Sequence, residues 1–194
     1  MANDVWGIKL GSSGCSPPWR HFEVLKHPPE HAHLDALYCL AAAACWLHGL
    51  DIYAGSVKHV LAGMVSALPK KLPRDGVLER HIRQAAELYG LAIYRCGQTA
   101  GWNDLVDPTI PVSTIMIASV QGLPVPGLQE PPEDFRFVLV LGIADKKRRF
   151  LIADPHPDTP EKYKVPVAEF EIAWEATATE TANPKALAVW KPDR

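Results

Sequence analysis

The chain has 194 residues, of which 47% are hydrophobic and 22% are charged, with a formal net charge of -2 at pH 7. This composition is close to that of an ordinary globular protein, so disorder is not expected for most of the chain. The balanced charge gives no general attraction to nucleic acid or to acidic membranes.

No apolar run approaches the roughly 18 residues that a membrane-spanning helix needs, and the first residues lack the pattern of a signal peptide. We therefore expect a cytoplasmic protein without membrane insertion. The four cysteines include no C-x-x-C pair, and in that compartment they are expected to be free thiols (Cys15, Cys39, Cys45 and Cys96).

Residues 1–30 are rich in Pro, Gly and Ser, which predicts an irregular arm that can lie over a domain formed by residues 31–194. Asp35 is the expected N-cap of a helix over 36–48, and Gly49 ends it. Four consecutive alanines in this helix give it a thin face that a neighbouring element can approach closely.

Two further helices are expected in the first half of the chain. Ser56 is the expected cap of the second, which carries apolar residues at helical spacing and ends at Pro69. The third begins near Asp75 and ends at Gly90.

The second half of the chain changes to a strand-like period. Residues 120–134 form a loop rich in Pro and Gly, residues 102–106 form one helical turn, and a helix is expected over 167–175. The expected strands are 91–95, 112–119, 135–144, 149–154 and 186–190. Helices that mostly precede strands predict an α+β fold, with a helical layer packed on an antiparallel sheet.

Three segments together resemble the C39 peptidase family and its papain-like relatives, over roughly residues 30–192. They are the helix ending Cys45-Trp-Leu-His-Gly49, the hairpin Phe137–Gly142 with Phe150–Pro155, and the segment Val165–Trp174. The resemblance implies a papain-like fold. Members of this family clip double-glycine leaders and are often fused to bacterial export transporters.

The family's catalytic residues correspond to different residue types in this chain. The resemblance places Ala36 at the nucleophile and Arg136 at the general base, and only Asp154 keeps the residue that orients the base. The oxyanion-hole glutamine would fall near Glu30 or His31. Alanine has no group to ionise, and an arginine, whose pKa exceeds about 12, accepts no proton near neutral pH. We predict that Arg136 and Asp154 form an ion pair instead.

The resemblance therefore implies a catalytically inactive C39 peptidase-like protein that binds a peptide or protein segment in the former active-site groove. The candidate ligand contacts are Arg136, Asp154, His33 and Trp102. An accessory role in peptide processing or export follows, with a processing enzyme or a transporter as a possible associate. No cofactor is expected, and the sequence contains no phosphate-binding loop, dinucleotide fingerprint or nucleic-acid motif.

Two alternatives remain open on the sequence. The first is an active cysteine peptidase or acyl transferase that uses Cys39 as nucleophile, with His156 or His33 as base and Asp154 to orient it. The second is a metal-dependent hydrolase, because His31, His33 and Asp35 match the start of an H-x-H-x-D signature.

Overall fold

The computed structural model describes residues 24–50, 54–70, 79–96, 115–144, 149–179 and 186–192. The expected arm up to residue 23, the expected turn at 102–106 with Trp102, and the expected start of the third helix at 75–78 lie outside these ranges. Within them, no helix is both long and apolar enough to cross a membrane.

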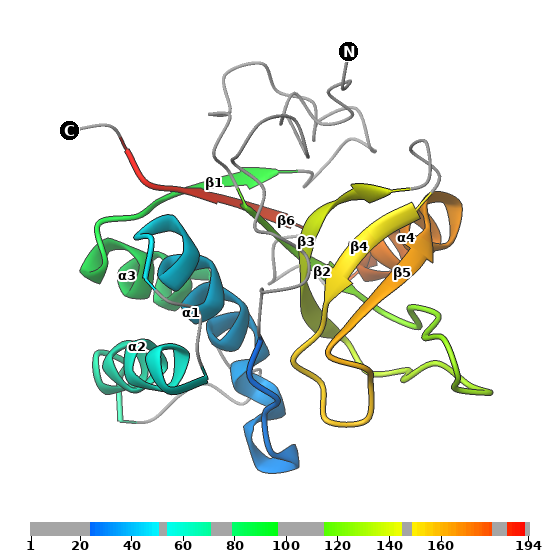
Figure 1. Ribbon diagram of the computed structural model, residues 1–194, viewed down its shortest axis with the longest axis horizontal. Coiled ribbons are helices and arrows are strands. Elements are labelled where there is room, and N and C mark those ends of the chain that lie inside the picture. Colours follow the sequence, from blue (N-terminus) through cyan, green and yellow to red (C-terminus); the bar gives the residue numbers. More distant parts are fainter. Residues whose placement is uncertain are drawn as a thin grey trace.

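The structure is α+β, as predicted, and the sheet has helices on both of its faces (Figure 1). The helices of the first half are the 3₁₀ helix η1 (Pro29–Leu34), α1 (Asp35–Leu47), α2 (Ala54–Ser66) and α3 (Glu79–Leu88). The later helices are α4 (Val167–Glu175) and the short η3 (Ala176–Thr179).

The described strands form one six-stranded antiparallel sheet in the order β1-β6-β2-β3-β4-β5. The strands are β1 (Ala92–Cys96), β2 (Ile115–Val120), β3 (Arg136–Ala144), β4 (Arg149–Ala153), β5 (Lys162–Pro166) and β6 (Ala186–Trp190). The closing strand β6 inserts between β1 and β2, so the end of the chain completes the sheet.

Alternate side chains of the central strands enter two separate cores. On β2, Ile115 and Ile117 pack with helix α1, whereas Met116 and Ala118 pack with α4. Every residue of β2 is consequently buried. The sequence predicted one helical layer, and α4 with Phe170 and Trp174 supplies a second one on the opposite face of the sheet.

Helix α1 is the centre of the first core, and its alanines are completely buried. Their small side chains let α1 lie close to β3, α2 and α3, as the sequence predicted. Gly49 ends the helix with a φ of 63°, a backbone conformation that glycine adopts without steric cost.

Three local predictions were wrong. Asp35 is not the N-cap of α1, because it already has helical φ and ψ of -53° and -38°, and Leu34 takes the cap position. Helix α2 begins at Ala54, before Ser56, and ends at Ser66, before Pro69. Strand β5 was not expected, because lysines alternate with its buried Tyr163 and Val165.

Candidate functional site

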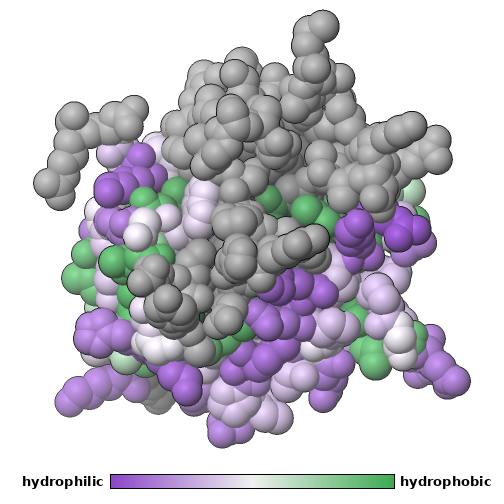
Figure 2. Space-filling view, in the orientation of Figure 1, coloured by the Kyte–Doolittle hydropathy of each residue, from purple (hydrophilic) through white to green (hydrophobic). Residues whose placement is uncertain are grey.

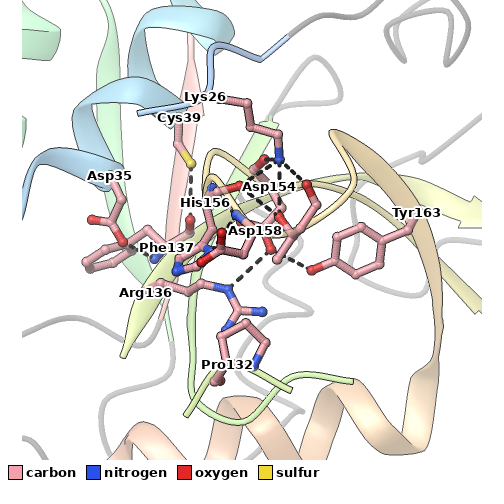
Figure 3. Close-up of polar contacts among 11 residues, drawn as sticks. Lys26, Asp35, Cys39, Pro132, Arg136, Phe137, Asp154, His156, Asp158 and Tyr163 are labelled. Carbon is pink, nitrogen blue, oxygen red and sulfur yellow. Dashed lines mark hydrogen bonds and ion pairs between the residues drawn. The ribbon is translucent and has the colours of Figure 1, made fainter. Parts of the chain in front are cut away.

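Three elements meet where the sequence placed the former active site. They are the first turn of α1, the start of β3 and the residues that follow β4 (Figure 3). Asp35 connects the first two of them, because its Oδ2 accepts a hydrogen bond from Phe137 N at 2.6 Å. Its Oδ1 accepts one from Ala36 N at 2.7 Å, within the first turn of α1.

The ion pair predicted between Arg136 and Asp154 is present. Arg136 Nε donates to Asp154 Oδ2 at 3.2 Å, and the two residues are only 2% and 0% exposed. Tyr163 donates its hydroxyl to the same oxygen at 2.6 Å, and His156 N donates to Oδ1 at 2.9 Å. Burial and the neighbouring Asp154 charge raise the pKa of Tyr163, so the tyrosine remains a donor at neutral pH.

Burial limits what this pair can touch. Arg136 also donates from Nη1 to Pro132 O at 3.2 Å, and its Nη2 has no partner in the part of the chain that the structure describes. Because both side chains are buried, neither presents an open surface to a ligand in this structure. Their proposed role as ligand contacts would require the residues covering them to move.

Ala36 lies in the first turn of α1 and is 1% exposed. Cys39 lies one turn further along α1, fully buried, and its Sγ donates to Phe137 O at 3.5 Å. Burial, followed by the Asp35 and Asp154 charges, raises the pKa of the Cys39 thiol well above its usual value. A nucleophilic cysteine needs the opposite shift, towards the thiolate.

The predicted histidines do not gather around one ligand. His33 is exposed, whereas His31 Nδ1 lies 3.1 Å from the hydroxyl of Tyr38. His156 Nδ1 accepts a hydrogen bond from Asp158 N at 3.2 Å. Among the described residues, no cluster of His, Cys, Asp and Glu could hold a metal ion. The carboxylate of Asp35 lies in the core, hydrogen-bonded to Phe137 N, so the structure does not bring it together with His31 and His33.

Residues 24–28, which we call the strap, belong to the arm that the sequence predicted, but their contacts were not foreseen. The strap lies against the loop that follows Asp154. His27 N donates to Pro155 O at 3.0 Å, and the His27 ring packs edge-on against the rings of His156 and Tyr38. Lys26 extends to the same loop (Figure 3). The partners of Lys26 lie more than 120 residues away from it in the sequence, and no local pattern in the sequence indicates such a contact.

A groove of about 420 Å³ lies beside the site, between the strap, the first turn of α1 and helix α2; we call it the α2 groove. Its walls are mainly apolar, with one lysine from the strap, one lysine from α2 and one histidine from η1. The lining residues are Leu25, Lys26, Pro28, His31, Leu34, Tyr38, Lys58, Leu61, Ala62 and Val65.

No protein-family model and no curated protein matches this chain. Solved structures do match. The peptidase domain of Streptococcus ComA, a bifunctional ABC transporter, is 17% identical, with 89% of this chain and 100% of that chain covered at a TM-score of 0.52. A double glycine motif protease from an AMS/PCAT transporter, solved in complex with the leader peptide, is 16% identical, with 95% and 98% covered at a TM-score of 0.49.

A third match is the Pseudomonas avirulence protein AvrPphB, which is 9% identical, with 89% of this chain and 97% of that chain covered at a TM-score of 0.39. At sequence identities this low, a structural match gives information on the fold alone. The chain has an α+β fold that matches the structure of the ComA peptidase domain, in agreement with the fold that the sequence predicted.

We predict that Arg136→Met lowers the free energy of unfolding by roughly 3–5 kcal/mol, because it leaves the buried Asp154 carboxylate without its cation. The double variant Arg136→Met/Asp154→Asn should cost less than the sum of the single variants. Urea unfolding measures both. Arg83→Met is the control, since its ion pair with Glu79 is partly exposed and its loss should cost less than about 1 kcal/mol. Equal costs at the two arginines would contradict the prediction.

Asp35 predicts a second effect, on the pH dependence of stability. Burial is the main reason that its pKa rises from 3.8 to about 7, although the bonds from Phe137 N and Ala36 N oppose the shift. Between these values the folded chain binds more protons at Asp35 than the unfolded chain does, so this carboxyl makes stability fall as pH rises. Above about 7 the contribution should level off.

Urea unfolding of the native protein and of Asp35→Asn from pH 4 to pH 8 checks this effect. As pH rises, the free energy of unfolding of the native protein should fall relative to that of Asp35→Asn. Above about pH 7 the difference between the two should become constant. Parallel curves over the whole range would show that Asp35 does not titrate there.

Proposed function

We propose that this protein is a catalytically inactive C39 peptidase-like domain that binds a peptide or protein segment, as an accessory in peptide processing or export. The observation that carries the proposal is the composition of the former catalytic site. Ala36 lies in the first turn of α1, and Arg136 and Asp154 form a buried ion pair. In the proposal, these residues take the positions of the nucleophile, the base and its orienting carboxylate.

The chemistry supports inactivity. Nucleophilic catalysis needs an ionisable nucleophile within hydrogen-bond reach of a base. Ala36 provides no nucleophile, and the guanidinium of Arg136 is committed to Asp154 and Pro132. Cys39, the alternative nucleophile, donates its thiol proton to a main-chain carbonyl, and His156 accepts from Asp158 N. A working enzyme would have to break both contacts.

The α2 groove supports the binding half of the proposal. It is apolar and about 420 Å³ in volume, which suits side chains of a bound segment. Leu34 and Tyr38 bring it to the beginning of α1, the turn that also contains Ala36. A second groove of about 590 Å³ lies at the other end of α1, around His48, Leu50 and Leu88. Figure 2 shows hydrophobic residues on the side of the molecule where the first three helices lie.

We choose the α2 groove because it is lined by residues at the beginning of α1, the turn that contains Ala36. The ComA domain that has this fold is described as a peptidase domain. A domain that keeps the fold and a nearby groove, but lacks the reacting groups, can retain recognition of a polypeptide without cutting it.

The test is a selection of random 12-residue peptides on the immobilised protein, followed by fluorescence anisotropy of the selected peptides. Ala62→Glu places a charge in the α2 groove and should weaken binding at least about tenfold. His59→Glu on the same helix is the control, because His59 is exposed and does not line the groove, and it should change binding less than about twofold. Mass spectrometry should find the peptides intact.

Peptides that bind both variants equally would contradict a site in the α2 groove. Cleavage by the native protein would contradict inactivity.

A further inference from the structure

The loop from Asp154 to Glu161 is built around a cation. The bond from Asp154 N to Glu161 O, 3.0 Å long, closes the loop. Its carbonyl oxygens at Asp154, His156 and Thr159 converge on Lys26 Nζ, at 2.7, 2.8 and 2.7 Å. Thr159 Oγ1 adds a fourth oxygen at 3.1 Å. We call residues 154–161 the ammonium loop.

The number of partners suits a primary ammonium group. An ammonium group has three N–H donors and no acceptor, and the loop offers three carbonyl oxygens and one hydroxyl. Burial lowers the pKa of the Lys26 ammonium, and the Asp154 and Glu161 carboxylates oppose this shift by stabilising the positive charge. A planar guanidinium presents its donors in a flat fork, which matches carboxylates better than a ring of carbonyls.

The strap has few other polar connections to the loop. Val24 N donates to Glu161 Oε1 at 3.1 Å and His27 N donates to Pro155 O at 3.0 Å. Lys26 therefore provides most of the polar contacts between the two segments. An extended peptide could reproduce this pattern, because it requires one lysine and a main-chain N–H beside it.

We propose that the ammonium loop is a binding site for the lysine side chain of an extended peptide segment, and that Lys26 of the strap fills this site within the same chain. The strap then acts as an internal competitor for lysine-bearing partners. Residues 154–161 do not line the α2 groove, although Lys26 of the strap contacts both places, so the inference goes beyond the function proposed above.

The internal lysine has a large advantage over a free peptide. A short tether holds a binding group at an effective concentration in the millimolar range, so weak external peptides do not displace it. Removing the Lys26 ammonium should expose the site. Lys26→Glu does so and also repels the strap, because it places a carboxylate against the carbonyl oxygens.

The experiment measures binding of a labelled peptide with the sequence of Val24–Pro29 to the full-length Lys26→Glu variant by fluorescence anisotropy. We expect at least tenfold tighter binding than to the native protein. Replacing the peptide's lysine by norleucine should weaken binding at least tenfold. Lys70→Glu is the matched control, since Lys70 is exposed on the surface, and it should behave as the native protein does.

Three outcomes would overturn the proposal. One is the absence of binding to a Lys26→Glu variant whose circular dichroism is native. Another is equal binding of the lysine and norleucine peptides. The last is displacement of the lysine peptide by potassium chloride but not by choline chloride at equal ionic strength, which would assign the site to a free cation.

A measurement on the native protein covers the case in which Lys26→Glu does not fold. Lysine acetylation followed by peptide mapping should modify Lys26 at least tenfold more slowly than Lys70, because the loop holds its ammonium. Equal rates would overturn the proposal. Because residues 154–161 do not line the α2 groove, equal binding of the lysine and norleucine peptides would overturn this site and leave the α2 groove standing, whereas failure of Ala62→Glu to weaken binding would leave this site standing.

Discussion

The buried carboxylate of Asp154 is the group on which the described site depends. One of its oxygens accepts from Arg136 on β3 and from Tyr163 on β5, and the other accepts from the main chain of His156. Its own carbonyl oxygen accepts from Lys26. A single residue after β4 thus connects the neighbouring strands, the following loop and the strap.

Burying a charged group costs free energy unless hydrogen bonds and opposite charges compensate for the hydration that it loses. Asp154 has them, and the geometry they impose leaves Arg136 with two of its three nitrogens engaged. We interpret this as a change of role. We propose that Arg136 replaces the base of a peptidase of this fold with a fixed cation, which stabilises a junction of strands. The same junction then positions the ammonium loop, because its first carbonyl belongs to Asp154.

The parts of the fold that the sequence predicted have local causes. The alanine run and Gly49 define α1, and the apolar period of Phe137–Leu141 and Phe150–Ile152 defines the hairpin of β3 and β4. The Arg136–Asp154 pair could also be predicted, because a family resemblance placed the two residues in register. Strand β5 could not, since alternating lysines in a short segment are equally typical of a loop.

The features that the sequence did not reveal depend on contacts across the fold. An aspartate before a helix suggests a cap, and only the position of Phe137, 102 residues away, shows that Asp35 bonds to a strand instead. The partners of Lys26 are 128 to 133 residues away, in a loop whose carbonyls converge only after the chain turns. Main-chain oxygens belong to every residue type, so no pattern of side chains indicates such a site.

Alkylation of the native protein tests the proposal that this fold has lost its reacting groups. Iodoacetamide would be applied at pH 6 and pH 8, with the modified cysteines identified by peptide mapping. The account predicts that Cys39 reacts slowly at both pH values and becomes accessible only on unfolding, because it is buried and its pKa is raised. Fast and saturating modification of Cys39 at pH 6 would contradict the account, since it would reveal an activated thiolate in the former active site.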